Sequence, residues 1–351
     1  MTDKLRLGLI GTGWVANQHM AGARSVAAHD LEVTAACDPR RDVLDDFCDR
    51  HGIGARFASA GELISSGTVD AVVLLTPPAV RHEVIDPALE HGLHVLVEKP
   101  FGENGHDAVT FTESAEAAGV TMAVSQNFRW FPEYAWLSDR LGRTDAGGIA
   151  FVEARTFQNR PQAPGAWRAE ETKLEMAIFS VHLIDRVRWI ARTPPVSVRA
   201  VTRRRRGSSL RGEQFSSLLI EFAGGAVGTV TSSWTSRTLP VNTFRVDTDL
   251  GSASVERTAP MSGDATGTAH FGAEPERLTF AETQPGEHAA LSYGSSLREF
   301  AVAIAERRTP QHSARDNLQT MGIMEAAYRS AARGGTPVTI EEALYGHVAY
   351  A

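Results

Sequence analysis

The sequence predicts an α/β protein with an N-terminal doubly wound parallel sheet and a C-terminal α+β part containing a large, mostly antiparallel sheet. Strand and helix signals alternate over the first 125 residues, and a glycine-rich turn follows the first strand. After residue 126, longer alternating segments are separated by Gly-rich turns. At roughly 100–200 residues per domain, a chain of 351 residues suffices for two domains, which we place at 1–125 and 126–351.

Short apolar runs alternate with helical segments in the first of these domains. The predicted strands are residues 5–10, 32–37, 71–75, 94–97 and 122–124. The predicted helices between them are residues 16–28, 39–51, 81–91 and 108–118. Because helices of about 10–15 residues separate the strands, the pattern indicates βαβ units and therefore a parallel sheet.

The second domain has longer strand-like segments and fewer helices. Strands are predicted at 197–201, 216–222, 226–232, 244–248 and 252–255. Gly-rich turns such as Gly224-Gly225 are typical of connections between antiparallel strands. Helices are predicted at 176–190, 295–307 and 317–333. Residues 258–272, which are rich in Gly, Ala, Thr and Ser, are predicted to form a loop.

Composition and charge exclude several classes of protein. The 35 Lys and Arg against 42 Asp and Glu give a formal net charge of −7, which disfavours a dedicated nucleic-acid binder. Cys37 and Cys48 make no disulfide framework, and no apolar run approaches the roughly 18 residues of a membrane span. The N-terminal residues do not fit a signal peptide, so we expect a cytoplasmic protein with no membrane partner.

Two charged or polar patterns receive an ordinary structural interpretation. Four consecutive arginines at 203–206 are interpreted as a solvent-exposed strand edge or hairpin tip, with a phosphate-binding patch as the alternative. Histidines occur at 51, 82, 91, 94, 106 and 182 without the spacing of metal ligands. We therefore predict no metal site.

A glycine-rich loop follows the first predicted strand and opens the first predicted helix. Residues 11–16, Gly-Thr-Gly-Trp-Val-Ala, fit the dinucleotide-binding loop of a Rossmann domain, in which the second glycine admits a pyrophosphate. The helix N-terminus adds N–H groups that can bind phosphate. An ordinary tight turn is the alternative. The residues predicted to bind the cofactor here are Gly11, Thr12, Gly13, Trp14 and Val15.

Asp38 ends the second predicted strand, about 20 residues after the loop, where a carboxylate can accept a hydrogen bond from the adenosine ribose. A carboxylate at this position repels the 2′-phosphate of NADP and therefore favours NAD. Arg40 and Arg41 follow at once and offer that phosphate a partner, so NADP stays open. A helix-capping role for Asp38 is the ordinary alternative.

Two further motifs follow predicted strands, at the edge where open α/β sheets bind ligands. Thr76, Pro77 and Pro78, with His82, follow the strand at 71–75, and Glu98-Lys99-Pro100 follows the strand at 94–97. Together with the glycine loop they resemble the Gfo/Idh/MocA family of oxidoreductases. The resemblance covers nearly the whole chain and continues through Trp167-Arg168, His182 to Asp185 with Trp189, and the segments 222–226 and 325–330.

The resemblance implies an activity and assigns residues to it. Members of the family move a hydride between NAD(P) and a hydroxyl-bearing carbon of a sugar or cyclic polyol. The resemblance implies that Lys99 reaches the reacting hydroxyl and that His182 assists as acid or base. It also implies that Glu98, Lys99, His82 and the residues 76–78 border the cofactor, and that the C-terminal sheet forms a homodimer or homotetramer. The ordinary alternatives are a surface lysine and a core histidine.

The chain departs from the family at one position of the catalytic set. Many relatives carry an aspartate four residues before the histidine, on the same face of a helix, and here that residue is Ile178. Asp185, three residues after His182, is a candidate to take over the role of the missing carboxylate. Glu175, two turns away on the same predicted helix face, is a second candidate.

Substrate-binding candidates lie after the last predicted strand of the first domain and in a Pro-rich segment further on. Trp130 and Phe131 suit either stacking on a sugar or packing between domains. Arg155 and Arg168 are interpreted either as pocket cations or as members of surface ion pairs. The predicted substrate-binding residues, besides Lys99 and His182, are Asn127, Arg129 and Trp167, with Gln158, Asn159 and Arg160 bordering them.

Three functions are compatible with the sequence. The leading hypothesis is an NAD(P)-dependent oxidoreductase that acts on a sugar, a sugar acid or a cyclic polyol. The second is a dinucleotide-binding regulator or sensor without turnover, which the loss at Ile178 would suit. The third is an eliminase or glycosidase-type enzyme in which NAD is reduced and reoxidised within one cycle.

Overall fold

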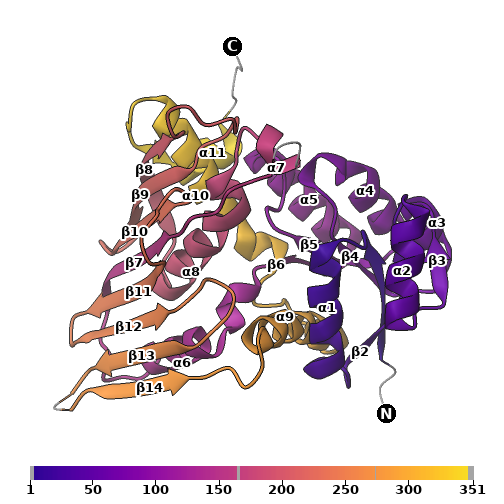
Figure 1. The fold of residues 1–351 in the computed structure, drawn as a ribbon, viewed down its shortest axis with the longest axis horizontal. Helices are drawn as coiled ribbons and strands as arrows, with labels where there is room; N and C mark the ends of the chain where they lie inside the picture. Colours follow the sequence, from indigo (N-terminus) through magenta and orange to yellow (C-terminus); the bar gives the residue numbers. More distant parts are fainter. Residues whose placement is uncertain (1–3, 164–166, 273, 347–351) are drawn as a thin grey trace. The chain divides into compact units, whose positions relative to one another are not determined.

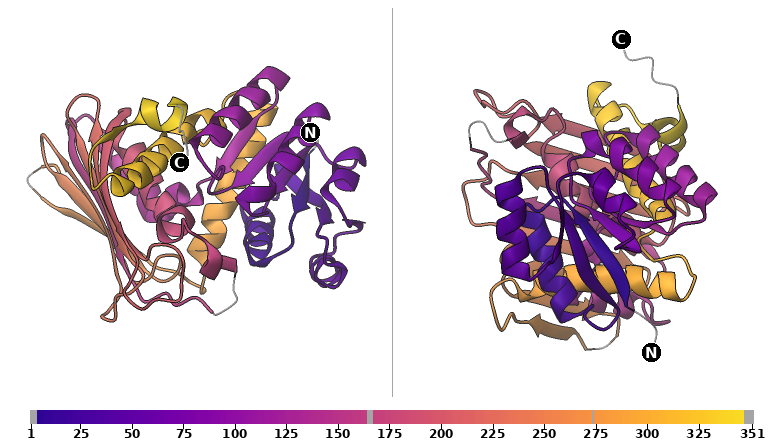
Figure 2. Two further views of the ribbon diagram at one scale, coloured as in Figure 1. Left: turned by 90° about the horizontal axis from the view of Figure 1, so that it is seen from above. Right: turned by 90° about the vertical axis from the view of Figure 1, so that its right-hand side faces the viewer.

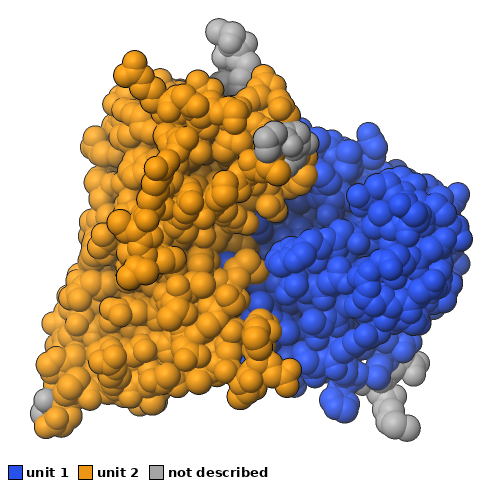
Figure 3. Space-filling model, in the orientation of Figure 1, with its two compact units in different colours: residues 1–130, 289–318 blue, residues 131–288, 319–351 orange. Residues whose placement is uncertain are grey.

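The computed structural model describes residues 4–163, 167–272 and 274–346, and the chain forms two compact units. Unit 1 comprises Met1–Trp130 and Ala289–Leu318, and unit 2 comprises Phe131–His288 and Gln319–Ala351 (Figure 3). The sequence placed one boundary at residue 125 and assigned all later residues to the second domain. The structure differs from that prediction because residues 289–318 belong to unit 1.

Unit 1 is built on six parallel strands in the order β3-β2-β1-β4-β5-β6 (Figure 1). The order reverses between β1 and β4, which makes the carboxyl edge beside β1 the ligand-binding position of an open α/β sheet. The predicted doubly wound parallel sheet is therefore confirmed. The strands are β1 (Leu5–Ile10), β2 (Leu31–Cys37), β3 (Ala55–Phe57), β4 (Ala71–Leu74), β5 (His94–Glu98) and β6 (Met122–Ser125).

Helices connect these strands, as expected of βαβ units. β4 is buried along its whole length because it lies near the middle of the sheet with helices on both faces. The short elements β3 and α3 were not predicted. The helical elements are α1 (Trp14–Ser25), α2 (Arg41–His51), α3 (Ala60–Ser65), η1 (Pro78–Val80), α4 (His82–Glu90), α5 (Gly105–Ala118) and η2 (Asn127–Trp130).

Helix α9 (Glu287–Ala305) brings a late part of the chain into unit 1. Phe300 of α9 is fully buried in the same apolar cluster as Leu9 of β1. The backbones of α1 and α9 touch where two glycines meet, since a Cβ at Gly22 would lie 2.4 Å from the backbone N of Gly294. This packing explains why a segment so distant in sequence belongs to unit 1.

Unit 2 contains a nine-stranded sheet in the order β14-β13-β12-β11-β7-β10-β9-β8-β15 (Figure 1). Its neighbours pair antiparallel except β7 and β10, which are parallel. The predicted large, mostly antiparallel sheet is therefore confirmed. The strands are β7 (Ile149–Phe157), β8 (Pro195–Arg203), β9 (Phe215–Phe222), β10 (Val227–Ser233), β11 (Val241–Thr248), β12 (Ser252–Arg257), β13 (Ala265–His270), β14 (Glu276–Phe280) and β15 (Val338–Thr339).

Helices of unit 2 pack on one face of this sheet (Figure 2). α8 packs on β7 and β10, and α6 packs on β12 and β13. The side chains of β10 accordingly alternate between buried and half-buried. Within the described residues, no helix has the length and apolar character needed to cross a membrane. The helical elements are α6 (Pro132–Leu141), α7 (Trp167–Glu170), η3 (Met176–Ser180), α8 (Val181–Ala191) and α11 (Ile340–Tyr345), together with α10 (Ala314–Ala332), whose residues up to Leu318 belong to unit 1.

The prediction of a loop at 258–272 is wrong, because this segment contains strand β13. Its small residues fit a large aromatic side chain of α6: a Cβ at Gly267 would lie 2.4 Å from the ring of Trp136. Gly and Ala have low intrinsic strand propensity, and packing decides the conformation instead. A composition rich in small residues therefore concealed a strand.

Candidate functional site

The glycine loop of unit 1 forms a sharp turn between β1 and α1. Gly11 adopts a φ of +101°, which favours glycine, and its N–H donates to the carbonyl of Cys37 at 2.8 Å. Helix α1 has Gly13 as its N-cap, without a side-chain cap and without an acidic residue in the first turn. A Cβ at Gly13 would meet nothing within 4 Å. The start of α1 therefore offers backbone N–H groups to a phosphate, which fits the diphosphate of a dinucleotide.

Asp38 lies beside this loop and is 3% exposed. Its carboxylate accepts hydrogen bonds from the N–H and hydroxyl of Thr12, both at 3.0 Å. Arg40 adds its backbone N–H, Nε and Nη2, each also at 3.0 Å. Burial acts to raise the pKa of Asp38, but the hydrogen bonds from Arg40 and Thr12 lower it to about 2. Asp38, which favours NAD, and Arg40, which offers a partner to the 2′-phosphate of NADP, thus form one ion pair.

The loops after β4 and β5 are joined by Arg81, a residue that the sequence analysis did not select. Arg81 is 1% exposed and donates to the carbonyl oxygens of Pro100 and Thr76. Burial lowers the pKa of Arg81 to about 9, while the charge of Glu98 acts in the opposite direction. The hydroxyl of Thr76 is buried and has no hydrogen-bond partner in the described part of the chain, which suits a residue beside a polar ligand.

The other predicted residues of this edge lie on η1 and α4. Pro77 precedes η1 as its N-cap residue and Pro78 begins it. His82 is half-exposed, with its ring 4.4 Å from that of Phe111 and its Nε2 3.6 Å from an oxygen of Asp107. The structure therefore turns His82 toward α5, and its role beside a nicotinamide stays a prediction.

Glu98 ends β5 and positions the backbone of Lys99. One carboxylate oxygen lies 2.9 Å from Nε2 of His19, and the other accepts the N–H of Lys99 at 3.2 Å. The ring of Tyr293 packs edge-on against His19, with centroids 4.8 Å apart. Burial acts to raise the pKa of Glu98, but His19 and Lys99 lower it below its usual value. The peptide bond between Lys99 and Pro100 is cis.

Asn127 and Arg129, predicted to bind substrate, tie η2 to the late segment of unit 1. Asn127 donates to the hydroxyl of Ser292 at 2.8 Å. Arg129 forms a 2.7 Å ion pair with Asp316 and donates to the carbonyl of Gln311 at 2.9 Å. Both side chains therefore hold the fold of unit 1, and their contact with substrate stays a prediction.

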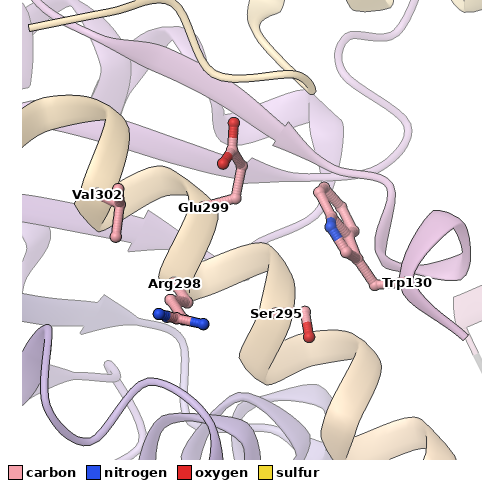
Figure 4. A pocket seen from close by; sticks show the side chains of 5 residues that line it. All are labelled: Trp130, Ser295, Arg298, Glu299 and Val302. Atoms are coloured by element: carbon pink, nitrogen blue, oxygen red, sulfur yellow. The ribbon is translucent and has the colours of Figure 1, made fainter. Parts of the chain in front are cut away.

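A hollow of roughly 280 Å³ lies next to Trp130 (Figure 4). Its walls are Trp130 and residues of α9, among them two charged side chains. Arg298 pairs with Asp30 at 3.2 Å, and Glu299 pairs with Arg308 at 2.8 Å. Both charges of the hollow are therefore already neutralised within unit 1.

The helix that carries His182 does not begin as the sequence predicted. The predicted single helix at 176–190 is the π-helical turn η3 followed by α8. Ile178 lies in the π turn, so its spacing to His182 differs from that in a continuous α-helix. Asp185 accepts hydrogen bonds from Thr320 at 2.8 Å and Arg188 at 2.9 Å. His182 and Asp185 are 4% and 1% exposed.

Glu175 lies at the start of η3 with its side chain directed at the sheet. It is fully buried and accepts hydrogen bonds from the hydroxyls of Ser180 at 2.7 Å and Ser216 at 2.6 Å. Burial raises the pKa of Glu175 to about 6, against the serine hydroxyls, which lower it. Glu213, whose charge also raises this pKa, accepts the N–H of Met176 at 2.9 Å. The two carboxylates anchor η3 to the sheet.

Trp167 is 53% exposed and lies against Arg168, whose guanidinium carbon is 5.2 Å from its ring centroid. Their contact with substrate stays a prediction. Over residues 4–163, 167–272 and 274–346, no group of three or more His, Cys, Asp or Glu side chains is arranged to hold a metal ion. The predicted site residues thus form two sets, one in each unit.

Family models match most of the chain. Residues 5–126 match the GFO_IDH_MocA model, described as an oxidoreductase family with an NAD-binding Rossmann fold. Residues 134–254 match the GFO/IDH/MocA C-terminal domain. These matches agree with the resemblance inferred from the glycine loop and the Glu-Lys-Pro motif.

Relatives of the chain include dehydrogenases of sugars. The chain is 26% identical over 341 residues to a D-apiose dehydrogenase of Paraburkholderia graminis, covering 93% of this chain and 88% of that protein. It is 24% identical over 336 residues to a D-xylose 1-dehydrogenase (NADP(+)) of Haloferax volcanii, covering 94% and 98%.

Solved structures share the fold at lower identity. A levoglucosan dehydrogenase in complex with NADH and L-sorbose gives a TM-score of 0.85 at 19% identity, covering 97% of this chain and 99% of the other. An oxidoreductase of Agrobacterium radiobacter in complex with NAD+, L-tartaric acid and magnesium gives 0.84 at 23% identity, covering 96% and 99%.

Proposed function

The chain belongs to the GFO/IDH/MocA family of oxidoreductases, and on that premise we propose that it transfers a hydride between NAD(P) and a hydroxyl-bearing carbon of a sugar, sugar acid or cyclic polyol. The observation that carries the proposal is the start of α1, where a glycine loop presents uncapped backbone N–H groups beside an ionised Asp38. Sugar dehydrogenases among the relatives support the substrate class.

The residues of unit 1 divide the work of holding the cofactor. Backbone N–H groups at the start of α1 bind its diphosphate, and Asp38 accepts a ribose hydroxyl. The bound nicotinamide would supply the hydride acceptor or donor. We place NAD first, because Asp38 is ionised and held in place by Thr12, and a 2′-phosphate would meet its charge. The side chain of Arg40 must then move away from Asp38 so that the carboxylate can accept the ribose hydroxyl. This side chain is 62% exposed and therefore has room to move.

Lys99 and His182 take the substrate proton in this proposal. Lys99 accepts the proton of the hydroxyl during oxidation and returns it during reduction. Glu98 orients Lys99 through the backbone N–H and keeps its negative charge close to the lysine. His182 serves as the second acid or base, and Asp185 restrains the helix that carries it through Thr320 and Arg188.

The first test is calorimetric titration of the nucleotide-free protein with NADH and with NADPH. Micromolar binding of one nucleotide, followed by its reduction or oxidation with a panel of sugars, sugar acids and polyols, supports the proposal. Binding without turnover would favour the dinucleotide-binding regulator, a function that fits Ile178 standing where many relatives carry an aspartate. Product formation without net NADH would favour the eliminase or glycosidase-type enzyme. Absence of binding to both nucleotides contradicts the proposal.

A further inference from the structure

The strands β7 and β10 of unit 2 run side by side and their pairing continues past their ends. The N–H of Gln158 donates to the carbonyl of Ser233 at 2.9 Å, and the N–H of Arg160 donates to the carbonyl of Trp234 at 3.0 Å. Gln158 and Arg160 lie just beyond the end of β7, the strand that α8 packs on.

Two arginines gather at this end of the sheet. The guanidinium carbon of Arg160 lies 4.8 Å from the ring centroid of Trp234 and 5.6 Å from that of Phe179, one turn before His182. Both Arg160 and Arg168 are half-buried. Burial lowers the pKa of Arg160, and the nearby charge of Arg168 lowers it further. The two cations are therefore close enough to repel each other.

Neither guanidinium has a carboxylate within ion-pair distance or an acceptor for its hydrogen bonds among the residues that the structure describes. Two buried arginines elsewhere in the chain pair with carboxylates: Arg257 with Glu133 at 2.6 Å and Arg188 with Asp185 at 2.9 Å. An unmatched buried or half-buried cation is costly, and its neighbour adds to the cost.

The same end of the sheet carries other donors without acceptors. Nε1 of Trp234, Nε2 of Gln158 and Nε of Arg168 are buried and have no hydrogen-bond partner in the described part of the chain. Trp234 itself is 1% exposed. Glu175 attracts Arg160, but its two oxygens accept hydrogen bonds from Ser180 and Ser216. The local balance is therefore an excess of donors and of positive charge.

We propose that Arg160 and Arg168 bind a carboxylate or phosphate group of the substrate, so that the protein acts on an anionic sugar derivative in preference to a neutral sugar. An arginine presents a planar fork of donors that matches either anion, and the aromatic rings fix the orientation of the fork. The inference rests on the proposed function only in taking the anion to be part of the substrate.

The test measures binding by calorimetry in the presence and absence of NADH. Each probe set shares one stereochemistry: D-glucose, D-gluconate, D-glucuronate and D-glucose 6-phosphate, followed by the corresponding galactose set. We expect the anionic members to bind at least about tenfold more tightly than the neutral sugar, since hydrogen bonds to charged groups are stronger than those between neutral groups. Comparison of the sugar acids with the sugar phosphate identifies whether a carboxylate or a phosphate is the ligand.

Variants assign this preference to the two arginines. Arg160→Gln and Arg168→Gln should each weaken the anionic ligands by about 10- to 100-fold and leave neutral sugars unchanged. Arg155→Gln is the matched control, because Arg155 lies on β7 with its side chain on the exposed face, 5.4 Å from the ring of Phe157. Arg160→Lys tests folding, since it keeps the charge beside Trp234 and should retain part of the preference.

Three results would overturn the inference: no anionic probe binds, neutral sugars bind as tightly as their anionic counterparts, or the glutamine variants leave anion binding unchanged. Nucleotide binding separates this inference from the proposed function. A wild-type protein that binds NADH normally but shows no preference for anionic over neutral sugars contradicts this inference alone. Anion binding in a protein that binds neither NADH nor NADPH sinks the proposed function and leaves the arginine site standing.

Discussion

Glu98 in unit 1 and Glu175 in unit 2 are both buried carboxylates, yet their pKa values move in opposite directions. Burial acts to raise both values. His19 and the charge of Lys99 reverse that effect at Glu98. Glu175 has hydroxyl partners and a second carboxylate, Glu213, close by, and its pKa rises to about 6. The partner, not the depth of burial, therefore decides whether a buried acid keeps its charge.

The difference matches what each carboxylate holds. Glu98 is a charged anchor for the loop that carries Lys99, at the edge where unit 1 is proposed to bind its cofactor. Glu175 anchors the π turn ahead of His182 through hydroxyls that can donate to a carboxylate or accept from a carboxylic acid. The contacts of Glu98 depend on its negative charge, whereas the hydrogen bonds of Glu175 can form whether its carboxyl group is ionised or protonated.

Removing the cation next to Glu98 should have the largest effect. Lys99→Met deletes the proposed acid and base, so kcat should fall by about 10²- to 10⁴-fold. NADH affinity should stay near the wild-type value, because Lys99 orients the substrate hydroxyl rather than the diphosphate. Steady-state kinetics and calorimetry measure the two quantities. Full turnover in this variant would contradict the assigned mechanism, and Lys99→Arg controls for charge alone.

Removing the hydrogen bond between His19 and Glu98 comes next. His19→Ala takes this partner from the buried carboxylate, and the free energy of unfolding should fall by about 3 kcal/mol. Urea unfolding at pH 7 measures the change. His19→Gln keeps an N–H donor and should recover part of the loss. An equal loss in both variants would attribute the effect to packing against Tyr293 instead.

The acid of unit 2 should respond to pH with the opposite sign from the acid of unit 1. A folded-state pKa raised from 4.5 to about 6 contributes stability that is fully present below pH 4.5 and is lost as the pH rises through 6. This shift corresponds to about 2 kcal/mol. Glu175→Gln should remove that slope from unfolding curves measured between pH 4.5 and 7.5.

The lowered pKa of Glu98 contributes stability above its unfolded-state pKa, and this contribution is lost as the pH falls through the folded-state pKa. Glu98→Gln should therefore leave the slope above pH 5 in place. Glu170→Gln is the control at an exposed carboxylate. A wild-type slope that survives in Glu175→Gln would show that other groups cause it.

A third carboxylate, Asp38, has a cation partner at the surface, and its removal should have the smallest effect. Arg40→Ala frees positions on Asp38 for a ribose hydroxyl and removes a partner for a 2′-phosphate. The side chain of Arg40 is 62% exposed, so the interaction contributes about 0.2–1 kcal/mol. NADH affinity should rise less than about fivefold while NADPH affinity falls. A rise in NADPH affinity would contradict the assignment.

Local patterns in the sequence predicted much of the fold of both units. The parallel strands, the glycine loop and Asp38 each depend on residues close together in sequence. The sequence analysis missed Arg81, His19 and Tyr293. Their roles arise from contacts between separate segments of the chain, and no sequence motif predicts such contacts. The π turn at Ile178 was missed because periodicity assumes a continuous α-helix, whereas this segment contains a π turn with Glu175 and Glu213 hydrogen-bonded beside it.

The glycine contact between α1 and α9 has a consequence for synthesis. Gly22 leaves the ribosome long before Gly294, with the whole span 131–288 of unit 2 made in between. At a synthesis rate of about 5–20 residues per second, helix α9 is made on the order of ten seconds or more after helix α1. Unit 2 can start to fold while unit 1 is incomplete. A gene shortened after residue 130 would therefore encode an unfinished cofactor-binding unit, whereas one that joins 1–130 to 289–318 would encode all of its parts.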